Sequence, residues 1–156
     1  MSLLQETLAA IQPRSQQHAA AFRERLDAAM TQPAGLGILQ DMLAAYAGIT
    51  GSDAPAIPAR QTIICCADHG VAAMKVSAYP PETTVQMTAN YLISRGAVAN
   101  ALSNFCGSSL EVADLGIAAP TDDLPGLLQK KIAPGTKNYA VGPAMTREQA
   151  IQALET

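Results

Sequence analysis

The sequence has no tryptophan, and aromatic residues make up only 4% of its 156 residues. So low an aromatic content argues against a β-sandwich core and against a platform on which nucleic-acid bases stack. Runs of basic residues are also missing, and 10 Lys and Arg residues against 13 Asp and Glu give a net charge of −3. Because nucleic-acid binding draws much of its affinity from lysine and arginine contacts with phosphates, we expect no nucleic-acid partner.

Long apolar runs are absent as well. No stretch approaches the roughly 20 apolar residues of a membrane helix, and the first residues lack the pattern of a signal peptide. We therefore expect no membrane association and a cytoplasmic location.

The three cysteines, Cys65, Cys66 and Cys106, form no C-x-x-C pair. Neighbours on a strand point to opposite faces, so one metal ion cannot easily bind both Cys65 and Cys66, and we expect free, at least partly buried thiols.

Apolar residues make up 49% of the chain, enough for the core of one ordinary domain. They recur at helical spacing in residues 4–11, 22–30 and 36–46. Residues 48–60 carry glycines and prolines with little periodicity, as surface connections do. We therefore predict an N-terminal helical segment over residues 1–59 and an α/β domain over residues 60–156.

Two short β-prone runs, residues 61–67 and 109–116, flank two stretches with helical spacing, residues 82–93 and 97–105. A strand, helices and a second strand predict a right-handed β-α-β crossover. The predicted fold class is thus α/β: N-terminal helices followed by part of an open, mostly parallel, Rossmann-like sheet with helical crossovers. The unbroken apolar run at 61–67 predicts a strand covered on both faces. Residues 127–139 are predicted to form two short strands, and a capping box of Thr146 and Gln149 to begin a last helix.

Polar residues follow both predicted strands, as Asp68-His69-Gly70 and Asp114-Leu115-Gly116. Ligands of open α/β sheets bind at the carboxyl ends of strands, so we expect Asp68, His69 and Asp114 to line a small-molecule crevice. A competing interpretation is that both aspartates only cap backbone amides in the loops that follow. A metal-dependent hydrolase that uses these three residues is a further alternative, but no metal-ligand spacing supports it. The sequence also has no G-x-G-x-x-G and no Walker lysine motif.

The loop over residues 76–87 is the most unusual stretch. Pro80 and Pro81 stiffen it, and it presents the phenol of Tyr79, the hydroxyl of Ser77 and the carboxamide of Gln86. Such a set would suit a flat apolar ligand with ring nitrogens. The alternative is that Tyr79 packs over the sheet edge and that Gln86 is an exposed residue at the start of a helix.

Several ordered blocks of sequence, taken together, carry a resemblance to one enzyme family. They are Ala67-Asp68-His69-Gly70-Val71, Val76-Ser77-Ala78-Tyr79-Pro80, Thr84-Val85-Gln86-Met87 with Asn90, Ala113-Asp114-Leu115-Gly116-Ile117, Pro134-Gly135-Thr136-Lys137-Asn138 and Gly142-Pro143-Ala144-Met145-Thr146. In this order they resemble the nicotinate-nucleotide:dimethylbenzimidazole phosphoribosyltransferases of the cobalamin lower-ligand pathway. The resemblance spans nearly the whole chain but only the N-terminal half of such enzymes.

The resemblance implies a transferase that moves the phosphoribosyl group of nicotinate mononucleotide to 5,6-dimethylbenzimidazole. It implies that Tyr79 and Gln86 line the bound azole, with Ser77 and Met87 as neighbours. It places the catalytic glutamate in the C-terminal half, so this chain holds no catalytic residue and is expected to be inactive alone. No cofactor or metal is expected. The expected partners are the two small molecules and either further copies of the chain, as a homo-oligomer, or the missing C-terminal half.

A second interpretation, from another functional class, stays open. The chain could be a non-catalytic azole-binding or assembly module that acts as an oligomer or together with a separately encoded C-terminal half. Binding of dimethylbenzimidazole without turnover would distinguish such a module from an inert fragment.

Overall fold

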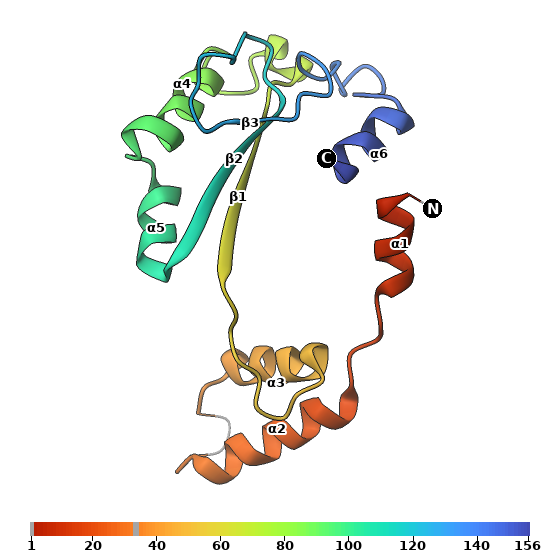
Figure 1. Cartoon of the computed structure of the whole chain (residues 1–156), viewed down its shortest axis with the longest axis vertical. Helices are drawn as coiled ribbons and strands as arrows, with labels where there is room; N and C mark the ends of the chain where they lie inside the picture. The colour runs from red at the N-terminus through yellow and green to blue at the C-terminus, as the bar shows by residue number, and fades with distance from the viewer. Residues whose placement is uncertain (1, 33–34) are drawn as a thin grey trace. The chain divides into compact units, whose positions relative to one another are not determined.

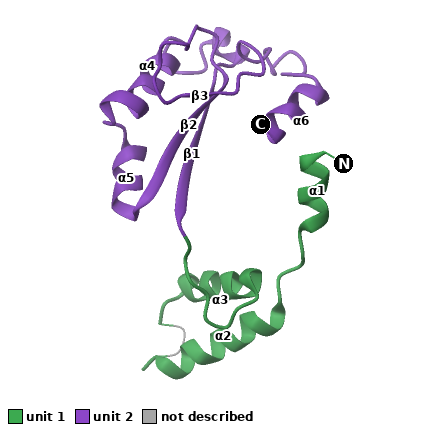
Figure 2. Ribbon diagram, in the orientation of Figure 1, with its two compact units in different colours: residues 1–58 green, residues 59–156 purple. Residues whose placement is uncertain are grey.

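The computed structural model describes residues 2–32 and 35–156 of the chain. The chain divides into two compact units, residues 1–58 and 59–156 (Figure 2). None of the helices in the described residues has the length and apolar character needed to span a membrane.

The first unit is helical and contains α1 (Leu3–Ala10), α2 (Gln16–Ala29) and α3 (Ile38–Thr50). Serine side chains cap α1 and α2: Ser2 accepts from the N–H of Gln5, and Ser15 accepts from the N–H of His18. These bonds satisfy amide groups that a helix start leaves without partners. Helix α2 packs along α3, where a side-chain ion pair joins Arg23 to Asp41.

Gly48 lies where the start of α2 comes close to the backbone of helix α3. The N–H of Ser15 donates to the carbonyl of Gly48 over 2.8 Å, and a Cβ at position 48 would lie 2.7 Å from the Ser15 carbonyl oxygen. That carbonyl belongs to the backbone and cannot rotate away, so only glycine fits without a shift of the helices.

We therefore expect Gly48→Ala to lower the free energy of unfolding of this unit by about 1–3 kcal/mol, although alanine is the better helix former. Urea unfolding followed by circular dichroism would measure the change. Ile49→Ala is the matched control, because Ile49 is 70% exposed on the same helix and its truncation should cost less than about 0.5 kcal/mol. Equal losses in the two variants would contradict the close-approach explanation.

The second unit is an α/β structure, as predicted (Figure 1). Its described strands are β1 (Arg60–Ala67), β2 (Ser108–Gly116) and β3 (Leu128–Gln129), which form a parallel sheet in the order β1-β2-β3. The connection from β1 to β2 holds a 3-10 turn (Gly70–Met74), α4 (Thr83–Ala89), a π-helical turn (Asn90–Ser94) and α5 (Val98–Cys106). The last helix, α6 (Arg147–Glu155), begins with the predicted capping box of Thr146 and Gln149.

Two local predictions about strands are wrong. The region 127–139 forms only the two-residue strand β3, and Thr136 makes an isolated bridge with His69 instead of a second strand. Strand β1 is covered on one face only, because Ile63 is 59% exposed and Cys65 is exposed. The side chains of β1 are apolar on both faces of the strand, but the described residues of this chain cover mainly one of these faces.

The covered face of the sheet holds the core. Cys66, Val112, Ile117 and Leu127 are buried there and pack against Val85, Tyr91 and Leu92 of the α4 region. Burial raises the pKa of the Cys66 thiol, which keeps it protonated and unreactive. Cys65 and Cys106 are exposed, so the prediction of buried thiols is wrong for these two.

Candidate functional site

A crevice of about 370 Å³ lies at the carboxyl end of β1. Its walls come from the residues that follow β1, from the proline-containing loop and from the first turns of α4. The lining residues are Ala67, Asp68, His69, Val71, Ala72, Val76, Ser77, Tyr79, Pro80, Pro81, Thr83, Thr84 and Met87. We call this cavity the loop crevice. Its size and its mixture of apolar walls with a few polar groups are typical of a small-molecule site.

Three of the four residues predicted for an azole site, Ser77, Tyr79 and Met87, lie in this lining. Within the loop, the Tyr79 N–H donates to the Ser77 hydroxyl over 3.1 Å. Tyr79 is 72% exposed and does not pack over the sheet. The loop therefore presents an aromatic ring at the open side of the crevice.

Gln86 does not line the loop crevice and is exposed. Successive residues of a helix differ by about 100° in direction, so Met87 and Thr84 face the crevice while Gln86 faces away from it. Thr83 and Thr84, which the sequence reasoning did not select, do line it. Thr84 and Thr83 precede Met87 by three and four residues, a spacing that puts side chains on the same side of a helix. The sequence could have indicated this only if the helix were known to begin at Thr83.

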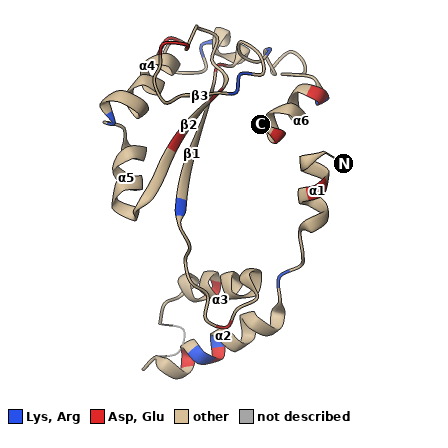
Figure 3. Cartoon of the chain, viewed as in Figure 1, with Lys and Arg blue, Asp and Glu red and all other residues tan. Residues whose placement is uncertain are grey.

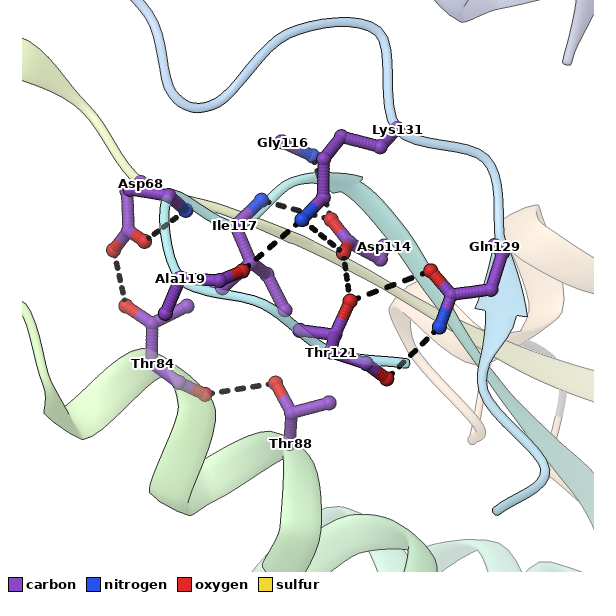
Figure 4. Close-up of polar contacts among 11 residues, drawn as sticks. Asp68, Thr84, Thr88, Asp114, Gly116, Ile117, Ala119, Thr121, Gln129 and Lys131 are labelled. Atoms are coloured by element: carbon purple, nitrogen blue, oxygen red, sulfur yellow. Dashed lines mark hydrogen bonds and ion pairs between the residues drawn. The ribbon is translucent and has the colours of Figure 1, made fainter. Parts of the chain in front are cut away.

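Asp68 fixes the crevice wall with both of its carboxylate oxygens (Figure 4). One oxygen accepts a hydrogen bond from the Thr84 hydroxyl over 2.6 Å, and the other accepts from the Ala118 N–H over 2.8 Å. Asp68 thereby ties the end of β1 to the first turn of α4 and to the loop after β2. Both of its oxygens therefore hold the structure around the crevice together.

Asp114 has a similar role at the end of β2 but is completely buried (Figure 4). One of its oxygens accepts from the N–H groups of Gly116 (3.0 Å) and Ile117 (2.8 Å). The other accepts from the Thr121 hydroxyl over 2.7 Å and lies 3.2 Å from the Lys131 ammonium. These contacts match the capping interpretation, and Asp114 is not among the residues that line the loop crevice.

The surroundings of Asp114 set its protonation state. Burial by itself would raise the pKa of the carboxyl, but the hydrogen bonds from Ile117 and Thr121 and the ammonium of Lys131 outweigh burial and hold the pKa below its ordinary value. The folded state therefore keeps Asp114 ionised at a pH where the unfolded chain already takes up a proton.

Because its folded pKa is lowered, the stabilisation from Asp114 is complete above the ordinary aspartate pKa of about 3.9 and is lost as the pH falls below it. We expect the free energy of unfolding to decrease as the pH falls from about 4 through the lowered pKa of Asp114, as measured by urea unfolding. The Asp114→Asn variant cannot titrate at this position and should show a smaller decrease. An equal decrease in both proteins would assign the acid sensitivity to other carboxyl groups.

His69 lines the loop crevice, but its side chain contacts Thr136 and neither aspartate. Its Nδ1 lies 3.2 Å from the Thr136 hydroxyl, and its backbone bridges to Thr136. Across residues 2–32 and 35–156, no group of three or more His, Cys, Asp or Glu side chains could hold a metal ion. The structure therefore does not bring Asp68, His69 and Asp114 together as the hydrolase alternative requires.

A second cavity of about 420 Å³ lies on the other side of the strand ends. Cys65, Leu115, Lys137, Met145 and Gln149 are among its lining residues, and His69 lines both cavities. We call it the sheet-face cavity. Its walls come from the sheet and from α6. The cavity was not predicted, because residues 130–145 have no regular pattern from which their position could be derived.

Comparison with known proteins gives consistent results. A family model described as phosphoribosyltransferase matches residues 11–156. The nicotinate-nucleotide–dimethylbenzimidazole phosphoribosyltransferase of Desulforamulus reducens is 41% identical over 156 residues, and that of a Roseiflexus species is 44% identical. The crystal structure of CobT from Thermus thermophilus superposes with a TM-score of 0.80 at 39% identity, over 88% of this chain.

Each relative is longer than this chain. The chain aligns with the two sequence relatives over 99% of its own length but spans only 44% of each of them. Its match to the Thermus structure spans 41% of that chain. The matched family model, the sequence identities and the shared fold agree, and the chain belongs to the nicotinate-nucleotide–dimethylbenzimidazole phosphoribosyltransferase family.

Proposed function

We propose that this chain supplies the azole-binding part of an enzyme that transfers the phosphoribosyl group of nicotinate mononucleotide to 5,6-dimethylbenzimidazole, forming α-ribazole phosphate. The observation that carries the proposal is the loop crevice, in a chain 41% identical to an enzyme named for this reaction. Ser77, Tyr79 and Met87 are the proposed azole contacts. Gln86 would join them only after a rotation of α4 or of its own side chain toward the crevice.

The reaction makes limited chemical demands. An azole nitrogen attacks the anomeric carbon, the carbon–nitrogen bond to nicotinate breaks, and the pyridinium leaves as a neutral pyridine. The remaining requirements are alignment of the two rings and a base that removes the azole proton. A rigid crevice can provide the alignment.

A free carboxylate base is what the described residues do not offer near the loop crevice. Both oxygens of Asp68 already accept hydrogen bonds, and Asp114 is buried and paired with Lys131. Glu82 lies at the exposed start of α4 outside the lining. We therefore propose that the isolated chain binds the azole but does not turn it over.

Two measurements on the isolated chain test this proposal. Isothermal titration calorimetry with 5,6-dimethylbenzimidazole should show binding at one site. An assay for α-ribazole phosphate with nicotinate mononucleotide and dimethylbenzimidazole should show no product. Absence of binding would overturn the assignment of the azole site, and turnover would overturn the claim that the chain lacks the base.

Tyr79 provides the sharpest test of the contacts. Its ring should stack against the azole, so Tyr79→Ser is expected to weaken dimethylbenzimidazole binding by about 3- to 10-fold in calorimetry. Tyr139→Ser is the matched control, because Tyr139 is also exposed (61%) but lies outside the lining of the loop crevice. Equal weakening in both variants would count against a role for Tyr79 in the site.

The exposed side of α5 favours a second role, in assembly. Val98, Leu102 and Phe105 follow helical spacing and are 74%, 59% and 90% exposed, while the side facing the sheet buries the polar Asn100 and Ser103. The helix carries no Lys, Arg, Asp or Glu (Figure 3). Such an apolar stripe suits self-association, so a homo-oligomer formed through α5 accompanies the proposed function. Sedimentation velocity of the chain and of Phe105→Ser would test it, since only the former should associate.

A further inference from the structure

His69 is held beside Thr136 by a short backbone bridge. The Thr136 N–H donates to the carbonyl of Asp68 over 3.0 Å, and the Gly70 N–H donates to the carbonyl of Thr136 over 3.0 Å. These two bonds flank His69 in the sequence and fix the place of the Thr136 side chain. The imidazole Nδ1 of His69 lies 3.2 Å from the Thr136 hydroxyl oxygen. The backbone therefore sets the contact between the two side chains.

This contact determines which imidazole nitrogen carries the proton. The Thr136 hydroxyl has a single proton, which it donates to the carbonyl of Lys137 over 3.0 Å. Toward His69 the hydroxyl oxygen can therefore only accept a hydrogen bond, so Nδ1 must carry the N–H. A neutral imidazole with its proton on Nδ1 keeps its lone pair on Nε2.

The second ring nitrogen, Nε2, makes no hydrogen bond with any group in residues 2–32 and 35–156. The two nitrogens lie on different sides of the ring, so Nε2 points away from Thr136. Thr136 lines the sheet-face cavity but not the loop crevice, whereas His69 is exposed and lines both. The side of the ring that carries Nε2 is thus left for the loop crevice.

We propose that Nε2 of His69 faces the loop crevice and accepts a hydrogen bond from the ring N–H of the bound azole. An azole of this kind has one N–H and one nitrogen with a lone pair. The bond to His69 fixes the side on which the N–H lies and leaves the lone pair of the other nitrogen free to attack. Asp68, the carboxylate of this lining, already accepts with both of its oxygens.

The inference rests on the proposed azole site and adds two roles to it. His69 binds and orients the azole, and Thr136 is a positioning residue that acts through the tautomer of His69. The removal of the azole proton during transfer is assigned to neither residue.

The tautomer can be determined in the chain without ligand. Long-range ¹H–¹⁵N correlation spectra at about pH 8.5, where histidine side chains are neutral, distinguish a protonated ring nitrogen from one with a lone pair. The sequence has two histidines, and His69→Phe identifies the signals of His69 by removing them. We expect the proton on Nδ1. A proton on Nε2 would overturn the proposal, whether or not the azole binds.

Ligands with and without an N–H test the contact itself. 1,5,6-Trimethylbenzimidazole carries a methyl group where 5,6-dimethylbenzimidazole has its N–H proton. The wild-type chain should prefer the dimethyl compound in calorimetry, and His69→Phe should reduce this preference by about 3- to 10-fold, the effect of one neutral hydrogen bond. His18→Phe is the matched control, because His18 contacts Asp53 in the helical unit and lies outside the crevice lining. An unchanged preference in His69→Phe would overturn the proposal.

Variants of Thr136 test the positioning role. Thr136→Val keeps the shape of the side chain but removes the hydroxyl, so the proton on Nδ1 loses its acceptor and is free to move to Nε2. Affinity for dimethylbenzimidazole should fall by about threefold or more, while affinity for the trimethyl compound stays unchanged. Thr136→Ser keeps the hydroxyl and should bind both compounds as the wild type does. Wild-type binding in Thr136→Val, or equal weakening in both variants, would overturn the role of the hydroxyl.

An azole titration separates this proposal from the proposed function. On addition of dimethylbenzimidazole, the Nε2 signal of His69 should move upfield along the same saturation curve as the amide signals of Ser77 and Tyr79. Saturation of those amides with an unmoved Nε2 signal would overturn the role of His69 and leave the azole site in place. Absence of any saturable change would overturn both proposals.

Discussion

Replacing Asp114 with alanine should lower the free energy of unfolding of the α/β unit by about 3–5 kcal/mol, the largest effect we expect from one substitution. The carboxylate is fully buried and accepts from two backbone amides and the Thr121 hydroxyl beside the Lys131 ammonium. Truncation would leave these donors without their acceptor in a site that water does not reach. Because small domains are stable by only about 5–15 kcal/mol, much of the protein should lose its fold on mild warming.

Thermal and urea unfolding, followed by circular dichroism, measure this effect. Asp123→Ala is the matched control, since it removes the same charge from an exposed position in the loop that follows β2. It should change the free energy of unfolding by no more than about 0.5 kcal/mol. A similar loss in both variants would mean that net charge, and not the buried network, sets the stability.

Gly70→Ala is expected to have the second largest effect. A Cβ at residue 70 would lie 2.6 Å from the backbone nitrogen of Asn138 and 2.8 Å from the carbonyl oxygen of Thr136. The Gly70 N–H also donates to that carbonyl over 3.0 Å. Either the strand end or the 136–138 loop must move, at a cost of about 1–3 kcal/mol or more. The move would also separate His69 from Thr136 and deform the crevice wall.

The measurement combines unfolding with azole calorimetry, because the substitution should reduce stability and dimethylbenzimidazole affinity together. Gly142→Ala provides the control, since a Cβ there meets nothing within 4 Å. Unchanged stability in Gly70→Ala would show that the backbone segments separate without cost and that position 70 has no steric need for glycine.

Local patterns were enough to predict much of the fold. The apolar run that became β1, the helical spacing that became α5 and the capping box at Thr146 are each determined by residues close in sequence. Asp114 shows where this approach stops, since its partner Lys131 comes from a loop without periodicity. The same holds for Gly70, whose requirement comes from residues 136–138, far along the chain.

The loop crevice shows a different limit. The family motifs pointed to Tyr79, Ser77 and Met87. These residues lie close together in the sequence, so the local structure of the loop and of the start of α4 is enough to bring them into one crevice lining. Gln86 belongs to the same motif, but one residue of difference on a helix turns its side chain out of the crevice. Sequence resemblance suggests candidate residues for a site, whereas the rotation of the helix decides which of them face the cavity.

Azole binding in the loop crevice can be located directly by nuclear magnetic resonance. Titration of the ¹⁵N-labelled chain with 5,6-dimethylbenzimidazole should shift the amide signals of Ser77, Tyr79 and Met87 along one saturable curve, while those of Val98 and Leu102 on α5 stay fixed. Shifts confined to Met145 and Gln149 in the sheet-face cavity, or no shifts at saturating azole, would contradict the assignment of the loop crevice as the azole site.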